Sequence, residues 1–240
     1  MTFNEPKWAL ITGAAKRIGK EIAVHLASKG YAIVAHYHTS QRQIEETVAL
    51  VQKKGVQCFP IACDLGQEEK VLELIPNILK KIKSLDVLVN NASVFEKATL
   101  QTSSLEQLNR HWHINLQAPY LLTQQFALLC KKGHIINILD TAICKNRTQH
   151  LPYLLTKKAL ANFTELSAIE LAPYIKVNAV SPGVILAPEN EEESYLVEKI
   201  KEVPLGIKGK TSQIAEAVQF LLEAHFVTGQ IIYIDGGQHL

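Results

Sequence analysis

Short apolar runs alternate with longer amphipathic stretches along almost the whole sequence. Apolar runs of this kind are typical of strands buried on both faces, and helical stretches between them indicate βαβ units. The pattern therefore predicts an α/β fold, a doubly wound parallel sheet with helices on both faces. Seven strands are expected, at Trp8–Ile11, Tyr31–Tyr37, Val56–Ala62, Leu85–Asn90, His134–Leu139, Ile175–Val180 and Gln230–Ile234.

Helical stretches separate these runs, and no repeat, low-complexity segment or linker divides the chain. Residues 1–240 are therefore predicted to form one domain, with the cofactor in its N-terminal half. Pro188–Glu193 is a polar segment after a strand, so it is a candidate mobile lid in a substrate loop expected around residues 184–200. The predicted helices are Lys20–Lys29, Gln41–Lys54, Glu68–Lys83, Ser104–Lys132, Tyr153–Leu171 and Ser212–Ala224.

The composition argues against several classes of function. A net charge of +2 is too small to indicate binding to nucleic acid or to an anionic membrane. Lysines precede Gly30, Gly55 and Gly133, where cation and glycine together are typical of helix C-termini. The four cysteines form no CxxC pair, and neither a signal pattern nor an apolar run of membrane length is present, so we expect a cytoplasmic protein.

The segment Thr12–Gly19 follows the first strand and opens the first helix. Gly13 allows a tight turn, Gly19 allows the helix to approach the sheet, and the helix N-terminus offers N–H groups to a pyrophosphate. The strand and helix around the motif favour a dinucleotide site over a plain βα turn. Arg17 stands where a middle glycine is common. It could brace a phosphate, reach a substrate carbonyl, or be an exposed cation at the helix start.

The end of the second strand indicates which dinucleotide binds. An NAD site would place Asp or Glu here to accept hydrogen bonds from the adenosine ribose, and neither is present. Donors and positive charge suit a 2′-phosphate instead, so NADPH is the expected cofactor. The alternatives are two strand-end histidines without a ligand, or a metal site, for which no carboxylate or cysteine is positioned nearby. The donors are Lys16, His36, His38, Thr39, Ser40 and Arg42, with Tyr37 among them in sequence.

Two further strand ends fit a cofactor groove. Asp64 and Leu65 end the third strand, where a side chain can meet an adenine edge. Asn90 to Ser93 follow the fourth strand, beside the topological switch point of the sheet. Adjacent asparagines are also ordinary turn residues, so this second segment alone does not require a ligand.

Tyr153 and Lys157 are the candidate catalytic pair. Their i, i+4 spacing places a phenol and an ammonium on one face of a helix that follows the fifth strand. A free tyrosine has a pKa of about 10 and holds its proton tightly. A neighbouring cation is expected to lower that pKa and make the phenol a workable acid.

With these motifs in order along the chain, the sequence resembles the short-chain dehydrogenase/reductase family over its whole length. The matching residues include Thr12–Gly19, Asn90–Ala92, Asn115, Tyr153–Lys157 and Ser181–Gly183. The resemblance implies a Rossmann fold, usually a tetramer, that transfers hydride from a nicotinamide. It makes Tyr153 the proton donor and Lys157 the ribose ligand. The remaining implied cofactor contacts are Gly13, Lys16, Arg17, Ile18, Gly19, His36–Ser40, Asp64, Leu65, Asn91, Ala92, Ser93, Pro182, Gly183 and Val184.

The same resemblance gives roles to residues outside the cofactor segments. Asn115 would support a proton-relay water through a local helix distortion. Most family members carry Ser where this chain has Asp140, whereas pteridine reductases and dihydromonapterin reductases carry Asp. By similarity to these, Phe95 would stack on a pterin, and Ser93 and Arg17 would contact the substrate or cofactor phosphates. Phe95 as a loop residue over the core, and Asp140 as a helix cap or surface carboxylate, remain the alternatives.

Three functions are compatible with these residues. The first is NADPH-dependent reduction of a dihydropterin or dihydrofolate to its tetrahydro form, with the proton supplied through Tyr153 and Asp140. The second is reduction of a carbonyl, such as a 3-oxoacyl thioester or a small ketone. The third is a cofactor-binding sensor or scaffold, which would have no need of a proton donor. Phe95, Asp140 and Arg17 favour the first. A homotetramer is expected, with contacts at His111–His113.

Overall fold

The computed structural model describes residues 5–188 and 193–240. Seven parallel strands form one sheet in the order β3-β2-β1-β4-β5-β6-β7. The order reverses between β1 and β4, which makes the sheet doubly wound and confirms the predicted fold class. The strands are β1 (Trp8–Ile11), β2 (Ala32–Tyr37), β3 (Cys58–Ala62), β4 (Val87–Asn90), β5 (Gly133–Ile138), β6 (Ile175–Pro182) and β7 (Ile231–Ile234).

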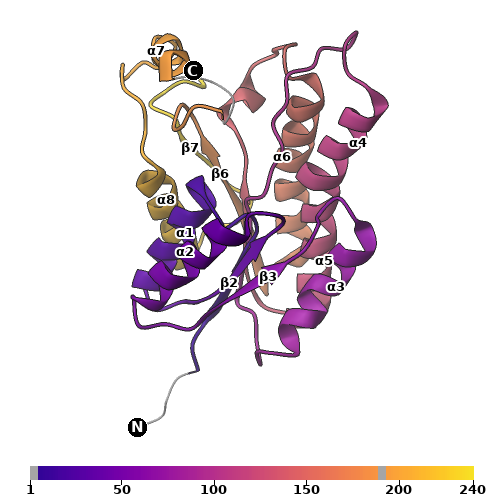
Figure 1. The fold of residues 1–240 in the computed structure, drawn as a ribbon, viewed down its shortest axis with the longest axis vertical. Coiled ribbons are helices and arrows are strands. Elements are labelled where there is room, and N and C mark those ends of the chain that lie inside the picture. Colours follow the sequence, from indigo (N-terminus) through magenta and orange to yellow (C-terminus); the bar gives the residue numbers. More distant parts are fainter. Residues whose placement is uncertain (1–4, 189–192) are drawn as a thin grey trace.

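Helices cover both faces of the sheet (Figure 1). On one face α1 (Arg17–Ser28) lies between α2 (Gln41–Gln52) and α8 (Thr211–Glu223). On the other face, α3 (Glu68–Leu79) packs against α5 (Ala118–Cys130), and α4 (Leu105–Trp112) packs against α6 (Leu151–Leu171). A further helix, α7 (Glu193–Ile200), lies beyond the carboxyl ends of the strands in the same view.

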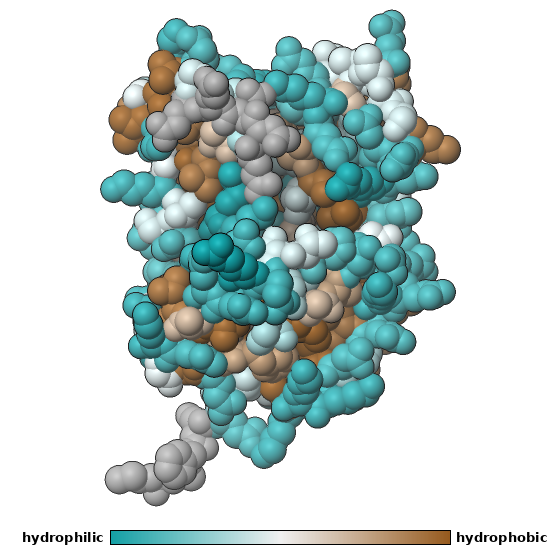
Figure 2. All heavy atoms as spheres, viewed as in Figure 1, coloured by the Kyte–Doolittle hydropathy of each residue, from teal (hydrophilic) through white to brown (hydrophobic). Residues whose placement is uncertain are grey.

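The core consists of two apolar layers, one on each side of the sheet. Along β1, Ala9 and Ile11 point into the layer under α1 and α8, whereas Trp8 and Leu10 point into the layer under α3 and α5. This alternation explains why the strand is apolar at every position. Polar side chains cover much of the outer surface in Figure 2. None of the helices in the described ranges is long and apolar enough to span a membrane.

The structure corrects the sequence-based helices in two places. The expected helix Ser104–Lys132 is divided into α4, a π-helical turn at His113–Gln117 and α5. A π-turn inserts one extra residue and redirects the side chains that it carries, which hydropathy does not reveal. The helix α7 was not predicted, because its sequence follows the polar segment that was assigned to a loop.

The glycines at helix ends behave as expected at two of three sites. Gly30 and Gly55 have φ values of +87° and +82°, the left-handed conformation that ends a helix. After α5, however, Lys131 itself takes the left-handed position, with φ of 62°. Gly133 is needed there for space, because a Cβ atom would lie 2.3 Å from the Asp86 carbonyl oxygen.

Candidate active site

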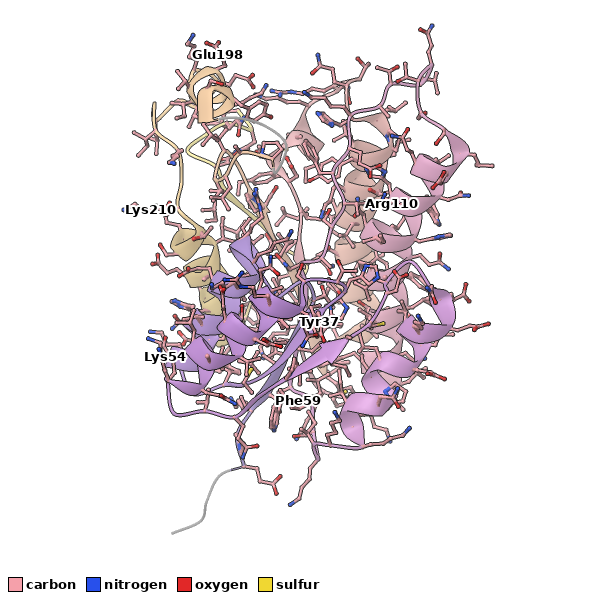
Figure 3. All side chains as sticks on the ribbon, viewed as in Figure 1. Tyr37, Lys54, Phe59, Arg110, Glu198 and Lys210 are labelled. Atoms are coloured by element: carbon pink, nitrogen blue, oxygen red, sulfur yellow. The ribbon has the colours of Figure 1, made fainter. Side chains whose placement is uncertain are left out.

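A cleft of about 1060 Å³ runs across the carboxyl ends of the strands on either side of the switch point. Tyr37, at the end of β2, and Arg110, on α4, are lining residues labelled in Figure 3. Asn115 and Arg42 do not line this cleft, whereas the other residues expected to contact cofactor or substrate do. These other residues are Gly13, Lys16, Arg17, Ile18, Gly19, His36, Tyr37, His38, Thr39, Ser40, Asp64, Leu65, Asn91, Ala92, Ser93, Phe95, Asp140, Tyr153, Lys157, Pro182, Gly183 and Val184.

The turn after β1 is closed by backbone contacts that leave no room for side chains. Gly13 has φ of +66°, and a Cβ atom on Gly19 would lie 2.2 Å from the Gly13 carbonyl oxygen. Asn91, which follows β4, donates from its side chain to the carbonyl oxygen of Thr12 at 2.8 Å. The turn is therefore held against the end of β4, and α1 begins directly beneath the cleft.

Arg17 occupies the position where a middle glycine is common, and its φ of 56° explains that preference. The arginine adopts the left-handed conformation that glycine would adopt without strain. Its guanidinium Nη2 donates to the carbonyl oxygen of Ala187 at 2.7 Å. Arg17 thus connects the cofactor turn to the expected substrate loop, rather than being merely an exposed cation.

His36 does not offer the positive charge that was expected of it. The side chain is buried, and its Nδ1 accepts a hydrogen bond from the Gly13 N–H at 3.1 Å. Nε2 must then carry the proton and donate to the Cys63 carbonyl oxygen at 3.0 Å. Burial lowers the pKa of His36 to about 4, although the bond to Cys63 partly opposes this. His36 is therefore a neutral support for the turn.

The outer end of β2 keeps the features that a 2′-phosphate requires. His38 is exposed, and its Nε2 lies 3.7 Å from an Asp64 carboxylate oxygen. Ser40 is the N-cap of α2, and the first turn of that helix carries no acidic residue.

Among the described residues, no group of three His, Cys, Asp or Glu side chains could hold a metal ion.

The residues present fit a dinucleotide. The first turn of α1 carries no acidic residue, and its N-cap Lys16 makes no side-chain cap, so the dipole and N–H groups can face a pyrophosphate. Any side chain at Gly19 would fill the space on which this close approach depends. The cleft then continues from His38 past Tyr153 to Phe95, long enough for a substrate beyond the cofactor.

At the other end of the cleft, the Tyr153 hydroxyl donates to Oδ2 of Asp140 at 2.7 Å. The pKa of Tyr153 is raised, by burial first and then by the charge of Asp140 and this hydrogen bond. The expectation that its pKa is lowered is therefore wrong for the protein without ligand, because the nearest charge is a carboxylate. Asp140 also caps the short 3₁₀ turn η2 (Thr141–Cys144), with Oδ1 accepting from the Ala142 N–H at 2.8 Å.

Lys157 is buried one turn after Tyr153. Its Nζ lies 5.8 Å from the centre of the Tyr153 ring and donates to the Ile138 carbonyl oxygen at 2.8 Å. Burial lowers the pKa of Lys157 to about 8, although the charge of Asp140 opposes this. The ammonium is therefore held by the end of β5 and not by the phenol oxygen.

Asn115 lies in the π-turn and is fully buried, which explains its absence from the cleft lining. Its side-chain oxygen accepts from the Val94 N–H at 2.9 Å, and its amide donates to the Val94 carbonyl oxygen at 3.0 Å. The amide also donates to the Thr156 hydroxyl at 3.3 Å. The expected helix distortion is present, and it fixes the loop before Phe95 to the helix that carries Tyr153.

Phe95 forms an aromatic group with two residues of the α6 region. Its ring meets the Tyr153 ring edge-on at 4.7 Å, and it stacks on His150 with a centroid distance of 4.2 Å. Phe95 remains 40% exposed in the cleft, so a ligand can reach it. Sequence reasoning missed His150, because its contact with Phe95 joins segments that are distant in sequence and no local pattern marks it.

The candidate lid Pro188–Glu193 lies partly outside the described residues, which omit 189–192. On either side of this gap, Leu186 and Pro188, and then Tyr195, Leu196 and Lys199, contribute to the cleft lining. Beyond α7, Glu202 forms ion pairs with Arg147 and Lys199. These bonds connect the end of the loop to the segment before α6.

Comparisons with known proteins agree with this geometry. The family model described as enoyl-(acyl carrier protein) reductase matches residues 13–239. The chain is similar to the 3-oxoacyl-[acyl-carrier-protein] reductase of Staphylococcus epidermidis, 31% identical over 98% of this chain and 99% of that protein. It is also similar to the dihydromonapterin reductase of Klebsiella pneumoniae, 30% identical over the full length of both. The solved structure of FolM alternative dihydrofolate reductase 1 from Brucella canis, complexed with NADP, superposes with a TM-score of 0.89 at 31% identity, covering 97% and 94% of the two chains.

Proposed function

Because the chain belongs to the short-chain dehydrogenase/reductase family and is an NADPH-dependent oxidoreductase, we propose that its substrate is a pteridine. The reaction is reduction of a dihydropterin or dihydrofolate to the tetrahydro form. The observation that carries this proposal is the position of the Asp140 carboxylate. It accepts a hydrogen bond from the Tyr153 hydroxyl at 2.7 Å, beside the accessible ring of Phe95. A dihydromonapterin reductase and an alternative dihydrofolate reductase among its relatives support it.

The cofactor supplies a hydride when it is bound. Of this chain's residues, the turn at Gly13–Gly19 would hold the pyrophosphate, and His38 to Ser40 would face the 2′-phosphate. Lys157, whose ammonium is already directed to the end of β5, would bind the nicotinamide ribose. Pro182 to Val184, in the lining where β6 ends, would contact the carboxamide.

Reduction of a C=N bond requires a hydride at carbon and a proton at nitrogen. Tyr153 would donate its phenolic proton to that nitrogen. Since burial and Asp140 raise the pKa of the phenol, an isolated phenolate would be costly. Asp140, once protonated from solvent, would donate to the phenol oxygen, which reverses the observed hydrogen bond, and it would pass its proton to Tyr153 as Tyr153 gives its own to the substrate. The two residues then deliver a proton without leaving a negative charge on Tyr153.

The shape of the cleft supports a flat aromatic substrate. A pterin gains free energy by stacking on a ring face, and Phe95 presents such a ring close to the proton donor. Arg17 and the loop that it contacts at Ala187 border the same end of the cleft. We propose that residues 184–200 cover the substrate when it binds.

The second candidate is reduction of a 3-oxoacyl thioester. The similarity to a 3-oxoacyl-[acyl-carrier-protein] reductase, at 31% identity over almost the whole chain, favours it. Tyr153 and Lys157 would serve a carbonyl equally well. This alternative gives Phe95 no task, because a thioester offers no aromatic ring for stacking.

A substrate panel tests the proposal. NADPH oxidation is followed with dihydrobiopterin, dihydromonapterin and dihydrofolate, beside acetoacetyl thioesters and simple ketones. We expect turnover of at least one of the pteridines. Turnover of the thioesters or ketones alone would overturn the assignment. The D140S variant is a second test of the proposal, because it should lose pteridine reduction while retaining NADPH binding.

We also propose that the protein is a homotetramer. Large apolar side chains remain exposed on the outer helices, including Leu105 and Trp112 on α4, Tyr120 on α5, and Leu166 and Ile169 on α6. Self-association would remove this apolar surface from water. His111 is buried whereas the adjacent Trp112 is 49% exposed, so within His111–His113 the tryptophan is the residue able to contact a neighbour. Light scattering during gel filtration would test this, and a monomeric mass would contradict it.

A further inference from the structure

The C-terminal segment of the chain holds the turn that carries Asp140. The turn η2 begins at Thr141, directly after Asp140, and ends at Cys144. The Thr141 hydroxyl donates to Oδ2 of Asp235 at 2.5 Å, and the Cys144 thiol contacts the Tyr233 hydroxyl at 3.1 Å. Both ends of η2 are therefore fixed by residues that lie about ninety positions later in the sequence.

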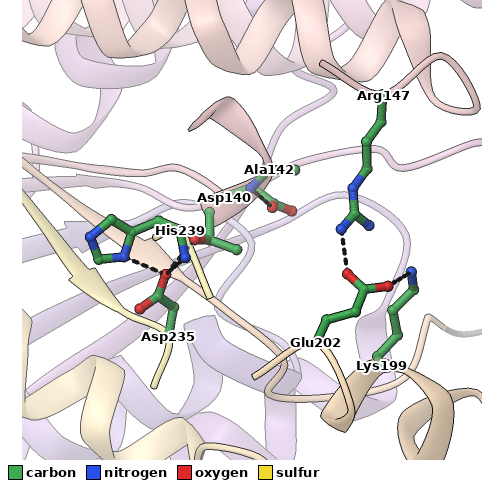
Figure 4. Close-up of polar contacts among 8 residues, drawn as sticks. Asp140, Ala142, Arg147, Lys199, Glu202, Asp235 and His239 are labelled. Atoms are coloured by element: carbon green, nitrogen blue, oxygen red, sulfur yellow. Dashed lines mark hydrogen bonds and ion pairs between the residues drawn. The ribbon is translucent and has the colours of Figure 1, made fainter. Parts of the chain in front are cut away.

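Asp235 is the centre of this attachment (Figure 4). Its side chain is 2% exposed. Oδ1 accepts from the Gly237 N–H at 3.0 Å, and Oδ2 accepts from the N–H and the Nδ1 of His239, both at 2.9 Å. The His239 ring in turn stacks on Tyr233 at 4.2 Å. A buried carboxylate with these bonds is a rigid point, because moving it would leave several polar groups unpaired.

The same residue also touches the cofactor side of the cleft. A Cβ atom on Gly183 would lie 2.5 Å from the Cβ of Asp235, and the Gly183 N–H donates to the Ile234 carbonyl oxygen at 3.0 Å. Asp235 therefore packs between the proposed carboxamide segment at β6 and the turn η2 at β5.

The orientation of Asp140 depends on where η2 begins. Its two carboxylate oxygens accept hydrogen bonds from different groups, Oδ1 from the Ala142 N–H inside η2 and Oδ2 from the Tyr153 hydroxyl. A shift of η2 by a fraction of an ångström would carry Oδ1 with it and rotate Oδ2 away from the phenol. The bond between Thr141 and Asp235 is a buried side-chain contact that opposes such a shift.

We propose that Thr141 and Asp235 are positioning residues for proton delivery. They fix η2 so that the Asp140 carboxylate faces the Tyr153 hydroxyl, and they act on the reaction through Asp140. The inference rests on the role of Asp140 in the proposed function. It adds that the C-terminal segment is part of the catalytic apparatus.

A pair of substitutions at one site tests it. T141V keeps the shape of the side chain but removes the donor, and T141S keeps the donor. We expect T141V to lower kcat about tenfold, the loss of one hydrogen bond of ordinary strength, with KM for NADPH unchanged. T141S should restore kcat to near the wild-type value. Wild-type kcat in T141V, or an equal loss in both variants, would overturn the proposal.

Two controls accompany this test. T123V separates the result from general damage, and the substrate panel separates it from a wrong substrate. T123V removes a buried hydroxyl on α5 that has no hydrogen-bond partner among the described residues, so it should leave kcat unchanged. D235N, which alters the acceptor of the Thr141 bond, should lower kcat as T141V does. All variants are assayed on every wild-type substrate found in the panel. If only a thioester is reduced, the pteridine assignment fails, and the comparison of T141V with T141S on that thioester still decides the positioning role.

Discussion

Two turns at the carboxyl edge of the sheet, after β1 and after β5, are held in place in different ways. The turn after β1, residues 12–17, is shaped by backbone contacts, by glycine and by a neutral buried histidine. The turn after β5, residues 139–145, is shaped by side chains, with a carboxylate bound to Tyr153 and a hydroxyl bound to Asp235. Anion binding to N–H groups needs only a backbone path, whereas proton transfer needs a side chain at a fixed distance.

We therefore expect the turn after β1 to serve cofactor binding and the turn after β5 to serve proton transfer. Changes in the first turn should affect cofactor affinity and stability, and changes around the second should affect turnover. The following variants test that separation, beginning with the greatest expected effect.

The most direct test is Y153F. It removes the phenolic proton but keeps the ring that meets Phe95 edge-on. We expect turnover to fall by about 10² to 10⁴, the contribution of a positioned general acid, with NADPH affinity unchanged. Steady-state NADPH oxidation and fluorescence titration measure the two quantities. Retained turnover would remove Tyr153 from the mechanism, and lost NADPH binding would show that the two turns are not separable.

The G19A substitution in the cofactor turn should mainly weaken NADPH binding, whereas Y153F should mainly lower turnover. The added Cβ would lie 2.2 Å from the Gly13 carbonyl oxygen, so the turn or the start of α1 must move by nearly 1 Å. We expect NADPH to bind about a hundredfold more weakly, the scale of effect that a displacement of this size can have. G30A is the control for backbone strain alone, because Gly30 also has a positive φ, of +87°, but nothing lies within 4 Å of a Cβ there. Equal NADPH affinity in wild type and G19A would contradict the close-approach explanation.

The third test concerns the buried histidine of the cofactor turn. Burial lowers the pKa of His36 from 6.5 to about 4, so the folded protein binds fewer protons than the unfolded chain between these values. Stability should therefore fall as the pH falls through that window. In H36N, whose amide oxygen can still accept from Gly13, the loss between about pH 7.5 and pH 5 should be smaller by about 2 kcal/mol.

Urea unfolding at the two pH values measures this difference. Some acid sensitivity should remain in H36N, because burial also lowers the pKa of His134 to about 4. H25N, at a partly exposed position on α1, serves as the control and should behave as wild type. An unchanged pH dependence in H36N would mean that folding does not lower the pKa of His36.

The smallest effect is expected at the outer end of β2. His38 is exposed, and exposed charge pairs contribute little. H38Q should weaken NADPH binding by about two- to fivefold and leave NADH binding unchanged, which corresponds to less than about 1 kcal/mol. Thermal shift titrations with the two nucleotides measure the preference. A similar loss for both would show that His38 does not face the 2′-phosphate.

Particular residues show how far the sequence alone could go. All seven strands were predicted close to their observed positions, because burial on both faces makes the central strands apolar runs, although the edge strands β3 and β7 are only partly buried. Gly13, Gly19 and Tyr153 were predicted from motif and spacing, and Asp140 from the family resemblance. His150 was not, because its stacking on Phe95 joins two loops that are distant in sequence.

Two expectations failed for a common reason. His36 was read as a phosphate ligand and Lys157 as the group that sets the Tyr153 pKa. In the structure Gly13 and Cys63 occupy the two nitrogens of His36, and Asp140 is the charge nearest to the phenol. Residue type limits the roles that a side chain can take, and its neighbours in space decide which of those roles it has.

The sequence by itself determined the doubly wound fold and the glycine turn, because these depend on periodic burial and on local backbone conformation, and it identified candidates for the reacting groups by residue type. The tertiary structure alone decided the protonation and orientation of those groups. The bonds of Asp140 to Tyr153 and of Thr141 to Asp235 join segments separated by 13 and 94 positions. Hydrogen bonding and desolvation act over a few ångströms of space, and only the folded chain brings such residues that close.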